Sequence, residues 1–415
     1  MSVRAFLQNL KKHIDSASLK SPYRFVTGNQ SADMDSVISA ISYSYFVNVK
    51  DSANYVIPLI NIPKEDLRLR RDIESLLKAH SITEDLLYFV EDFKRLNADA
   101  ETVELILVDH CNIQGDILTQ FLHAKKLKVV GIIDHHADEK VFLDANPRII
   151  HTNGSCSCLV FNYWYEQLGK DDDLFKKHSE IIELLLGPLV IDTSNLTQKV
   201  EEGDVIAFKK YQQLLDLQGA KSPTIKQILG PNTGITSSSS ELDVIAQFYM
   251  ALKSAKKDLS GFKFADVLRK DFKQFEFTSG DAVGFSSIGK ALKWVLSNYT
   301  TEEITATLSK ALVDFDIDLL VITSSYTQKE NDKYTREFAY YYEVKGNDKF
   351  DNLHDLAQAP LELDAEIYGA DKVNSKLEEV NSSSKGIFKI YNQHKITASR
   401  KQVVPIVKEI LEKRN

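Results

Sequence analysis

The sequence predicts an α/β protein: an N-terminal domain built on a doubly wound, mainly parallel sheet, followed by a smaller C-terminal α+β domain. Two observations predict this organisation. Short apolar runs alternate with amphipathic helical patterns through the first half of the chain, as in a parallel sheet covered by helices. Residues 219–240 then collect Gly, Pro and Ser, a composition typical of a linker. We therefore expect domains at 1–218 and 241–415, which suits a chain of 415 residues.

Apolar runs in the first half are the predicted strands. They lie at residues 23–27, 55–60, 86–90, 103–108, 129–133 and 189–191. The predicted helices between them lie at 36–46, 65–79, 113–124 and 157–168. Some of the apolar runs could instead be buried helix segments, because periodicity alone does not separate a short buried strand from a buried helix.

The C-terminal part opens with a long helical pattern at residues 240–259 and closes with another at 403–413. Strand-like runs lie between them at 282–288, 319–323 and 337–344. Helical segments separate these runs, so we expect a mixed α+β domain.

Composition narrows the class of protein. The chain has 51 Lys and Arg against 59 Asp and Glu, a net charge of −8, which argues against coating nucleic acid through a general basic field. Three cysteines are an odd number and too few for a disulfide scaffold, which fits a reducing compartment. No apolar run approaches the length of a membrane span or a signal peptide. We expect a soluble intracellular protein with no membrane or nucleic-acid partner.

Polar motifs follow four of the predicted strands in the N-terminal half. They are Asn29–Ser36, which includes Asp33 and Asp35, then Asp109-His110, then Asp134-His135-His136, and finally Asp192. In an open parallel sheet, ligands bind beyond the carboxyl ends of the strands. We therefore expect the four motifs to meet in one crevice.

Converging carboxylates would repel one another and raise each other's pKa, and divalent cations remove that conflict. Oxygen ligands with one or two imidazoles suit Mg²⁺, Mn²⁺ or Co²⁺ better than structural zinc. The four acids exceed what one ion needs, which favours two metals and in-line attack at phosphorus. Each acid taken singly is more simply a helix cap or turn former. The four motifs together favour the metal site.

A basic pair lies near the C-terminus. Ser399 and Gln402 have the spacing of a capping box, which places Arg400 and Lys401 at a helix N-terminus. Cations are disfavoured there by the helix dipole, and a bound anion would reverse the effect. The simpler alternative is a solvated basic pair. Lys273 belongs to a second charged run, which is weaker evidence because such runs are mostly solvated helix faces.

These motifs together resemble the DHH phosphoesterase superfamily. The first half resembles its catalytic domain, and residues 399–405 resemble the signature of the second type of DHH-associated domain, found in family II inorganic pyrophosphatases, prune-like proteins and fungal exopolyphosphatases. Family II pyrophosphatases carry a histidine where this chain has Asn29. Asparagine there is the pattern of exopolyphosphatases and prune-like proteins. Residues 60–67, 154–157 and 160–165 most resemble the fungal cytosolic exopolyphosphatases.

The resemblance implies roles for the motif residues. The implied metal ligands are Asn29, Asp33, Asp35, Asp109, His135 and Asp192, with Asp109 bridging two ions (Mg²⁺, Mn²⁺ or Co²⁺). The implied catalytic set is Asp33, Asp35, Asp109, His135, His136 and Asp192. The implied substrate contacts are Asn29, His136, Lys273, Ser399, Arg400 and Lys401, in a cleft between the two domains. Asp134 and His110 would orient ligands. An amide at Asn29 is a harder donor than imidazole, so we expect readier use of Mg²⁺.

The leading functional prediction is a cytoplasmic, monomeric exopolyphosphatase, with an additional mitochondrial pool left open. It would release terminal orthophosphate from linear inorganic polyphosphate by a metal-bound hydroxide. The alternatives are a family II-type inorganic pyrophosphatase, and a prune-like protein that acts on short chains or as a nucleotide phosphodiesterase. A related nuclease is disfavoured by the net charge.

Overall fold

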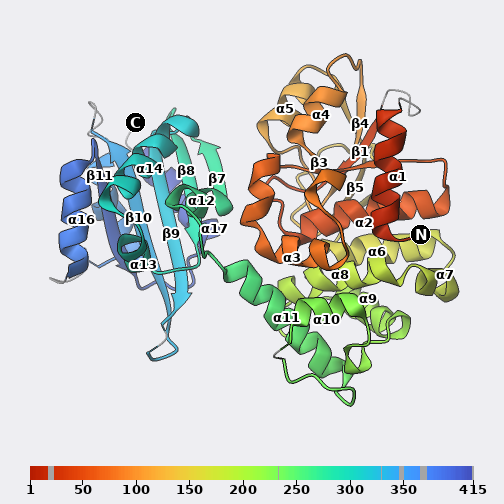
Figure 1. The fold of residues 1–415 in the computed structure, drawn as a ribbon. Coiled ribbons are helices and arrows are strands. Elements are labelled where there is room, and N and C mark those ends of the chain that lie inside the picture. The colour runs from red at the N-terminus through yellow and green to blue at the C-terminus, as the bar shows by residue number, and fades with distance from the viewer. Residues whose placement is uncertain (17–22, 232, 329, 345–349, 365–371, 414–415) are drawn as a thin grey trace. The chain divides into compact units, whose positions relative to one another are not determined.

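The computed structural model describes residues 1–16, 23–231, 233–328, 330–344, 350–364 and 372–413. The chain forms two compact units, Met1–Asp258 and Leu259–Asn415 (Figure 1). No helix in the described ranges has the length and apolar character needed to cross a membrane. The predicted α/β class with a second mixed-sheet domain is confirmed.

The first unit is built on a sheet whose described strands lie in the order β3-β2-β1-β4-β5-β6. Every neighbouring pair in it is parallel. The strands are β1 (Arg24–Thr27), β2 (Ile57–Ile60), β3 (Tyr88–Phe89), β4 (Val103–Val108), β5 (Leu127–Asp134) and β6 (Arg148–Ile150). The chain runs outward from β1 to β3 and then returns to β4 on the other side of β1. The strand order therefore reverses between β1 and β4, which is where ligands bind in such sheets.

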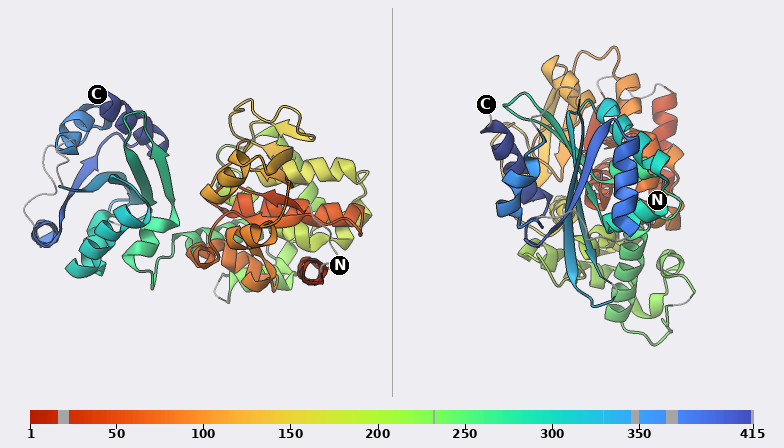
Figure 2. Two further views of the ribbon diagram at one scale, coloured as in Figure 1. Left: turned by 90° about the horizontal axis from the view of Figure 1, so that it is seen from above. Right: turned by 90° about the vertical axis from the view of Figure 1, so that its left-hand side faces the viewer.

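Helices cover both faces of this sheet (Figure 2). They are α1 (Val3–Asp15), α2 (Met34–Lys50), α3 (Arg71–Ala79), α4 (Val90–Leu96), α5 (Asp116–His123), α6 (Cys156–Gln167), α7 (Asp172–Lys177), α8 (Ser179–Asp192), α9 (Glu202–Leu214), α10 (Pro223–Leu229) and α11 (Glu241–Lys257), with 3-10 turns η1 (Lys64–Leu69), η2 (Glu84–Leu86) and η3 (Gln218–Ala220). Helix α2 is buried along most of its length and packs on α6 and α8. It therefore holds a fixed position beside the carboxyl ends of β1 and β4.

One predicted strand is wrong. Residues 189–191 lie inside helix α8, so Asp192 ends a helix and does not follow a strand. The run is apolar on all sides because α8 is buried among other helices, and periodicity does not distinguish such a helix from a buried strand. The sequence also missed strand β6, which is three residues long and only partly buried, so it lacks an apolar run.

The first compact unit extends beyond the linker expected at 219–240. Residues of that segment form η3 and α10, whose Ile225 and Leu229 are buried. Helix α11 follows and packs on α3 and α8, so the unit ends at Asp258. The Gly and Pro residues of this segment therefore mark turns within the unit. A linker was expected instead because composition does not show which core an apolar helix face will join.

The described strands of the second unit form a sheet in the order β11-β10-β9-β8-β7, in which β8 and β9 pair in parallel and the other described neighbours are antiparallel. Its strands are β7 (Phe272–Glu276), β8 (Ala282–Ile288), β9 (Leu319–Thr327), β10 (Tyr334–Glu343) and β11 (Gly386–Gln393). Its described helices are α12 (Phe264–Lys270), α13 (Leu292–Asn298), α14 (Thr301–Asp314), α15 (Leu353–Leu361), α16 (Lys372–Ser383) and α17 (Arg400–Glu412). Alternate residues of β8, β9 and β10 form one core with α15 and α17.

Strands β7 and β11 were not predicted from the sequence. Strand β7 carries Lys273, which was expected on a helix face, and its burial is only partial because it lies at the sheet edge. Strand β11 was not recognised from the sequence, because polar residues interrupt its apolar pattern and it begins after a polar helix. The predicted strands at 282–288, 319–323 and 337–344 correspond to β8, β9 and β10.

The start of β11 gives a test of this sheet order. Gly386 lies opposite Glu343 of β10, and a Cβ added there would collide with the backbone oxygen of Tyr342 and lie 2.7 Å from Tyr341 Cζ. We expect Gly386→Ala to lower the free energy of unfolding by about 1–3 kcal/mol, because backbone cannot move aside as a side chain can. Thermal unfolding with Gly289→Ala as control, where nothing lies within 4 Å, measures this. Equal midpoints for both variants would contradict the pairing.

Candidate metal centre

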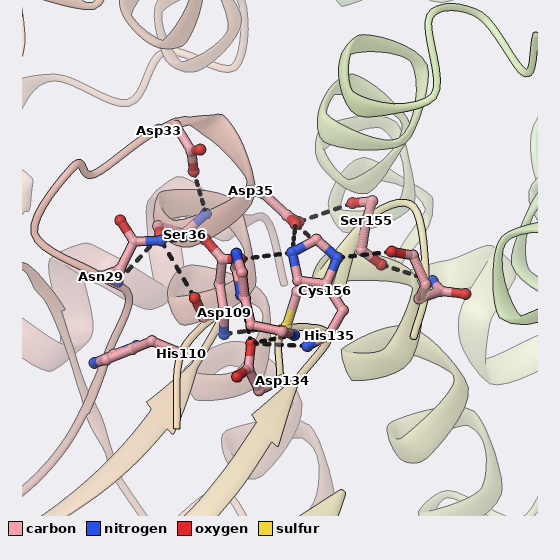
Figure 3. Close-up of polar contacts among 12 residues, drawn as sticks. Asn29, Asp33, Asp35, Ser36, Asp109, His110, Asp134, His135, Ser155 and Cys156 are labelled. Carbon is pink, nitrogen blue, oxygen red and sulfur yellow. Dashed lines mark hydrogen bonds and ion pairs between the residues drawn. The ribbon is translucent and has the colours of Figure 1, made fainter. Parts of the chain in front are cut away.

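Three neighbouring strands place the polar motifs together beyond the carboxyl ends of the sheet's strands (Figure 3). The loop after β1 carries Asn29 and Asp33, Asp109 follows β4, and Asp134 ends β5. Gly28 lets this loop approach helix α2, since a Cβ there would lie 2.7 Å from the Cα of Ser36. The expected convergence of the first three motifs is therefore observed.

Asp109 lies at the centre of the cluster. Its backbone is left-handed (φ 61°), which turns the chain sharply after β4, and its side chain is buried. Oδ2 accepts hydrogen bonds from Ser36 Oγ at 2.6 Å and from Asn29 Nδ2 at 2.8 Å. Oδ1 lies 3.0 Å from Nε2 of His135. Two neutral donors thus fix one oxygen and leave the other directed at the imidazole.

Asp35 is held by the N-terminus of another helix. It lies in the first turn of α2 and accepts hydrogen bonds from the start of α6: Ser155 Oγ at 2.8 Å, Cys156 N at 2.6 Å and Ser157 N at 2.8 Å. The amides and dipole of a helix N-terminus stabilise an anion there. The second oxygen of Asp35 lies 3.9 Å from Nε2 of His135.

The two histidines are oriented by different partners. Nδ1 of His135 lies 2.9 Å from the carbonyl oxygen of Asn153, which can only accept, so Nδ1 carries a hydrogen and Nε2 faces Asp109. Nδ1 of His136 lies 2.8 Å from Oδ1 of Asp134, and its side chain is 49% exposed. Asp134 itself is fully buried and also accepts from the amide of His135 at 2.7 Å.

Charge in the cluster is poorly compensated without a cation. Burial, followed by the charges of Asp33 and Asp35, raises the pKa of Asp109 well above its ordinary value. Burial and Asp35 likewise raise the pKa of Asp192. Burial alone would lower the pKa of His135, but its hydrogen bond to Asp109 and the charge of Asp35 raise that pKa to about 10. A divalent ion would relieve this repulsion.

The donor atoms present fit a divalent metal. Asp109, His135 and His136 each offer a ligand atom, and these atoms lie within 4.8 Å of one another. Among the described residues, Oδ2 of Asp192 is a buried carboxylate oxygen with no hydrogen-bond partner. Oxygen with imidazole ligands suits Mg²⁺, Mn²⁺ or Co²⁺.

Asp33 and Asp192 join the cluster electrostatically. Asp33 caps helix α2, accepting from Ser36 N at 3.1 Å, so the simple capping role considered for it is real. After burial, the charge of Asp33 raises the pKa of Asp35, Asp109 and Asp192. After burial, the charges of Asp35 and Asp109 also raise the pKa of Asp192. Asp192 reaches the group from the C-terminal end of α8, where the sequence had placed a strand.

Asn29 makes contacts that differ from those of a metal ligand. Its Oδ1 accepts from the amide of Ser31 at 2.9 Å and from the Ser31 hydroxyl. That partner fixes the orientation of the amide, because the Ser31 N–H can only donate. Nδ2 consequently faces Asp109, which it contacts at 2.8 Å. The described geometry gives Asn29 the role of holding Asp109, and ligation by Asn29 stays a prediction.

The predicted C-terminal residues lie in the second unit. Ser399 and Gln402 form the expected cap: the amide of Ser399 donates to Gln402 Oε1 at 2.9 Å. Arg400 donates to the backbone oxygen and to Oδ1 of Asp271, both at 2.7 Å, so an internal carboxylate offsets its charge. Lys401 is exposed, and Lys273 is partly buried on β7.

Sequence reasoning missed the residues that hold the cluster in place. Ser36 was read only as the last residue of the Asn29–Ser36 motif and the start of a helix. Asn153 and Ser155 gave no chemical signal, because small polar residues in loops are common. Their importance follows from distances between segments far apart in the chain. One sequence feature did point to this loop. The Gly-Ser-Cys-Ser stretch at 154–157 was noted, but only as part of the family resemblance.

Comparisons with known proteins show the family of this chain. Residues 24–187 match the model of the DHH family, N-terminal domain, and residues 250–410 match that of the DHHA2 domain. The chain is also 30% identical over 410 residues to a Schizosaccharomyces pombe protein named "Putative exopolyphosphatase", covering 97% of this chain and 95% of that one. The chain belongs to the DHH family.

Other relatives are less similar to this chain. Mouse exopolyphosphatase PRUNE1 is 25% identical over 394 residues (94% of this chain, 76% of that one). A manganese-dependent inorganic pyrophosphatase of Methanocaldococcus jannaschii is 24% identical over 342 residues (79% and 93%). A crystal structure of a protein described as "Methanococcus jannaschii putative family II inorganic pyrophosphatase" superposes with a TM-score of 0.52 at 20% identity (94% and 99%), which shows a shared fold.

His110 gives a test of the burial around the cluster. Its ring points away from the acids in Figure 3, with Nδ1 2.8 Å from the oxygen of Val108 and Nε2 buried. Burial lowers the pKa of His110 to about 4, so the ring is neutral at pH 7. Since the unfolded chain binds this proton near pH 6.5, His110 should destabilise the metal-free protein as the pH falls from 6.5 toward 4. An imidazole NMR titration with a midpoint near 6.5 would refute this.

Proposed function

We propose that this chain is a metal-dependent exopolyphosphatase that releases terminal orthophosphate from linear inorganic polyphosphate. The observation that carries the proposal is the buried group of carboxylates and imidazoles around Asp109, at the point where the strand order reverses. The likeness to the S. pombe protein extends along nearly the whole chain and supports this substrate class.

The proposed cofactors are two divalent ions, with Mg²⁺, Mn²⁺ and Co²⁺ as candidates. Their proposed ligands are Asp33, Asp35, Asp109, His135 and Asp192. When bound, such ions activate water for attack at phosphorus and screen the charge of the phosphate chain. The name of the manganese-dependent M. jannaschii relative supports a divalent requirement.

The remaining residues position the reacting groups. Ser36 and Asn29 fix Oδ2 of Asp109, and the start of α6 fixes Asp35, so neither carboxylate needs to reorganise during the reaction. Asp134 holds Nδ1 of His136, which leaves Nε2 of this half-exposed ring for a terminal phosphate oxygen. In the second unit, Lys401 is the proposed phosphate contact, together with Lys273, Ser399 and Arg400.

A pyrophosphatase is the second candidate, favoured by the similarity to the M. jannaschii enzyme. Asn29 argues against it. The resemblance places a histidine ligand there in family II pyrophosphatases, whereas the amide of Asn29 is engaged by Ser31 and Asp109. One protein ligand of the first metal position would then be replaced by a hydrogen-bond donor.

Initial rates of orthophosphate release separate these candidates. Long-chain polyphosphate, tripolyphosphate and pyrophosphate are each compared with Mg²⁺, Mn²⁺ and Co²⁺. We expect the highest kcat/KM on polyphosphate or tripolyphosphate, and loss of activity on chelation. Highest kcat/KM on pyrophosphate would transfer the assignment to the second candidate, and inactivity on all three would reject both.

Asp109→Asn tests the centre of the cluster. It keeps the shape of the side chain but removes the charge. We expect Mn²⁺ affinity, measured by calorimetry, to fall more than about 100-fold, because even residues that only support a ligand typically contribute 10–100-fold. Orthophosphate release should be lost in parallel. The exposed Asp144→Asn serves as control, and equal metal affinity in both variants would refute the role of Asp109.

Lys401→Ala tests the C-terminal basic pair. Hydrogen bonds to charged groups contribute about 1.5–3 kcal/mol, so loss of one phosphate contact should raise KM for polyphosphate roughly 10-fold or more with little change in Mn²⁺ affinity. Lys408→Ala, on the same helix α17, is the matched control and should leave KM unchanged. If Lys401→Ala leaves KM unchanged, the result would support the alternative that Arg400 and Lys401 are a solvated basic pair.

A further inference from the structure

The loop between β6 and α6 touches two residues of the metal centre at once. The carbonyl oxygen of Asn153 accepts from Nδ1 of His135 at 2.9 Å, and Ser155 Oγ donates to Oδ1 of Asp35 at 2.8 Å. These two site residues belong to different parts of the fold, since His135 directly follows β5 and Asp35 lies in the first turn of α2. A shift of this loop would therefore disturb an imidazole and a carboxylate together.

Asp204, in the first turn of helix α9, holds this loop. Its Oδ1 accepts from Asn153 Nδ2 at 2.7 Å and from the amide of Ser155 at 3.1 Å. Its Oδ2 accepts from the amide of Gly154 at 2.7 Å and from that of Glu201 at 2.9 Å. One carboxylate thus contacts three consecutive loop residues and the start of its own helix.

The contact is close and buried. Asp204 is 0% exposed, and in the described ranges no lysine or arginine forms an ion pair with it. A Cβ on Gly154 would lie 2.7 Å from Oδ2 of Asp204, and one on Gly203 would lie 2.6 Å from Oδ1 of Asn153. Glycine at both positions lets the helix and the loop approach this closely.

We propose that Asp204 is a positioning residue that sets the geometry of Asp35 and His135 through this loop, an inference that rests on the proposed metal-dependent function. Each of its two oxygens accepts two N–H donors, and only a carboxylate offers acceptors on both atoms. An amide at this position would turn an NH₂ group toward N–H donors. Burial without a cationic partner is costly unless the group is fully hydrogen-bonded, which explains why all four donors converge on it.

Asp204→Asn is the test, with Asp243→Asn as matched control. Asp243 occupies the same position in the first turn of α11, but it is exposed and hydrogen-bonds only within its own helix start. We expect Asp204→Asn to weaken Mn²⁺ binding by about 10- to 100-fold in calorimetry. The ¹⁵N resonances of the His135 ring in the metal-free protein should also shift, since its Nδ1 partner moves. The control should change neither quantity.

Unchanged Mn²⁺ affinity and unchanged His135 resonances in a folded Asp204→Asn protein would overturn the proposal. If that variant does not fold, Asn153→Ala decides, because it removes one donor to Asp204 and keeps the backbone oxygen that faces His135. A several-fold loss of Mn²⁺ affinity there supports the proposal, and none refutes it. Neither readout uses a phosphate substrate, so a failed polyphosphate assay would leave this result separately interpretable.

Discussion

Several carboxylates are buried together at the carboxyl ends of the strands, and the rest of the structure depends on this constraint. Asp35, Asp109 and Asp134 are each at most 2% exposed. Among the residues that the structure describes, the basic side chains within 4 Å of Asp35 and Asp109 are the imidazoles of His135 and His136. Neutral hydrogen-bond donors hold these carboxylates in place but compensate only part of their negative charge. The buried carboxylates thus outnumber the basic side chains beside them, an imbalance that a bound cation would relieve.

The fold meets this constraint with parallel-sheet geometry. The strand order reverses between β1 and β4, so the loops after these strands separate there and admit polar groups. Helix α2 then presents Asp33 at its N-cap and Asp35 in its first turn, and the N-terminus of α6 neutralises part of the charge of Asp35. Glycine at 28 and 154 allows the backbone approaches that bring these elements together.

Much of this arrangement could be predicted from the sequence. An apolar run ending in an acid marks a buried strand with a polar carboxyl end, which correctly placed Asp109 and Asp134. The same reasoning misplaced Asp192, because a helix buried on all sides is apolar throughout and looks like a strand. The edge strands β6 and β7 were missed because partial burial weakens the apolar pattern on which such predictions rest.

The sequence by itself determined which residues carry charge and which strands they follow, because local apolar patterns reflect burial directly. Only the tertiary structure decided how those residues are oriented. The amide of Asn29 faces Asp109, Ser155 holds Asp35, and Asp204 holds the loop beside both, through contacts between residues as many as 120 positions apart. Such contacts depend on how helices pack across the sheet, and no local sequence pattern records that packing.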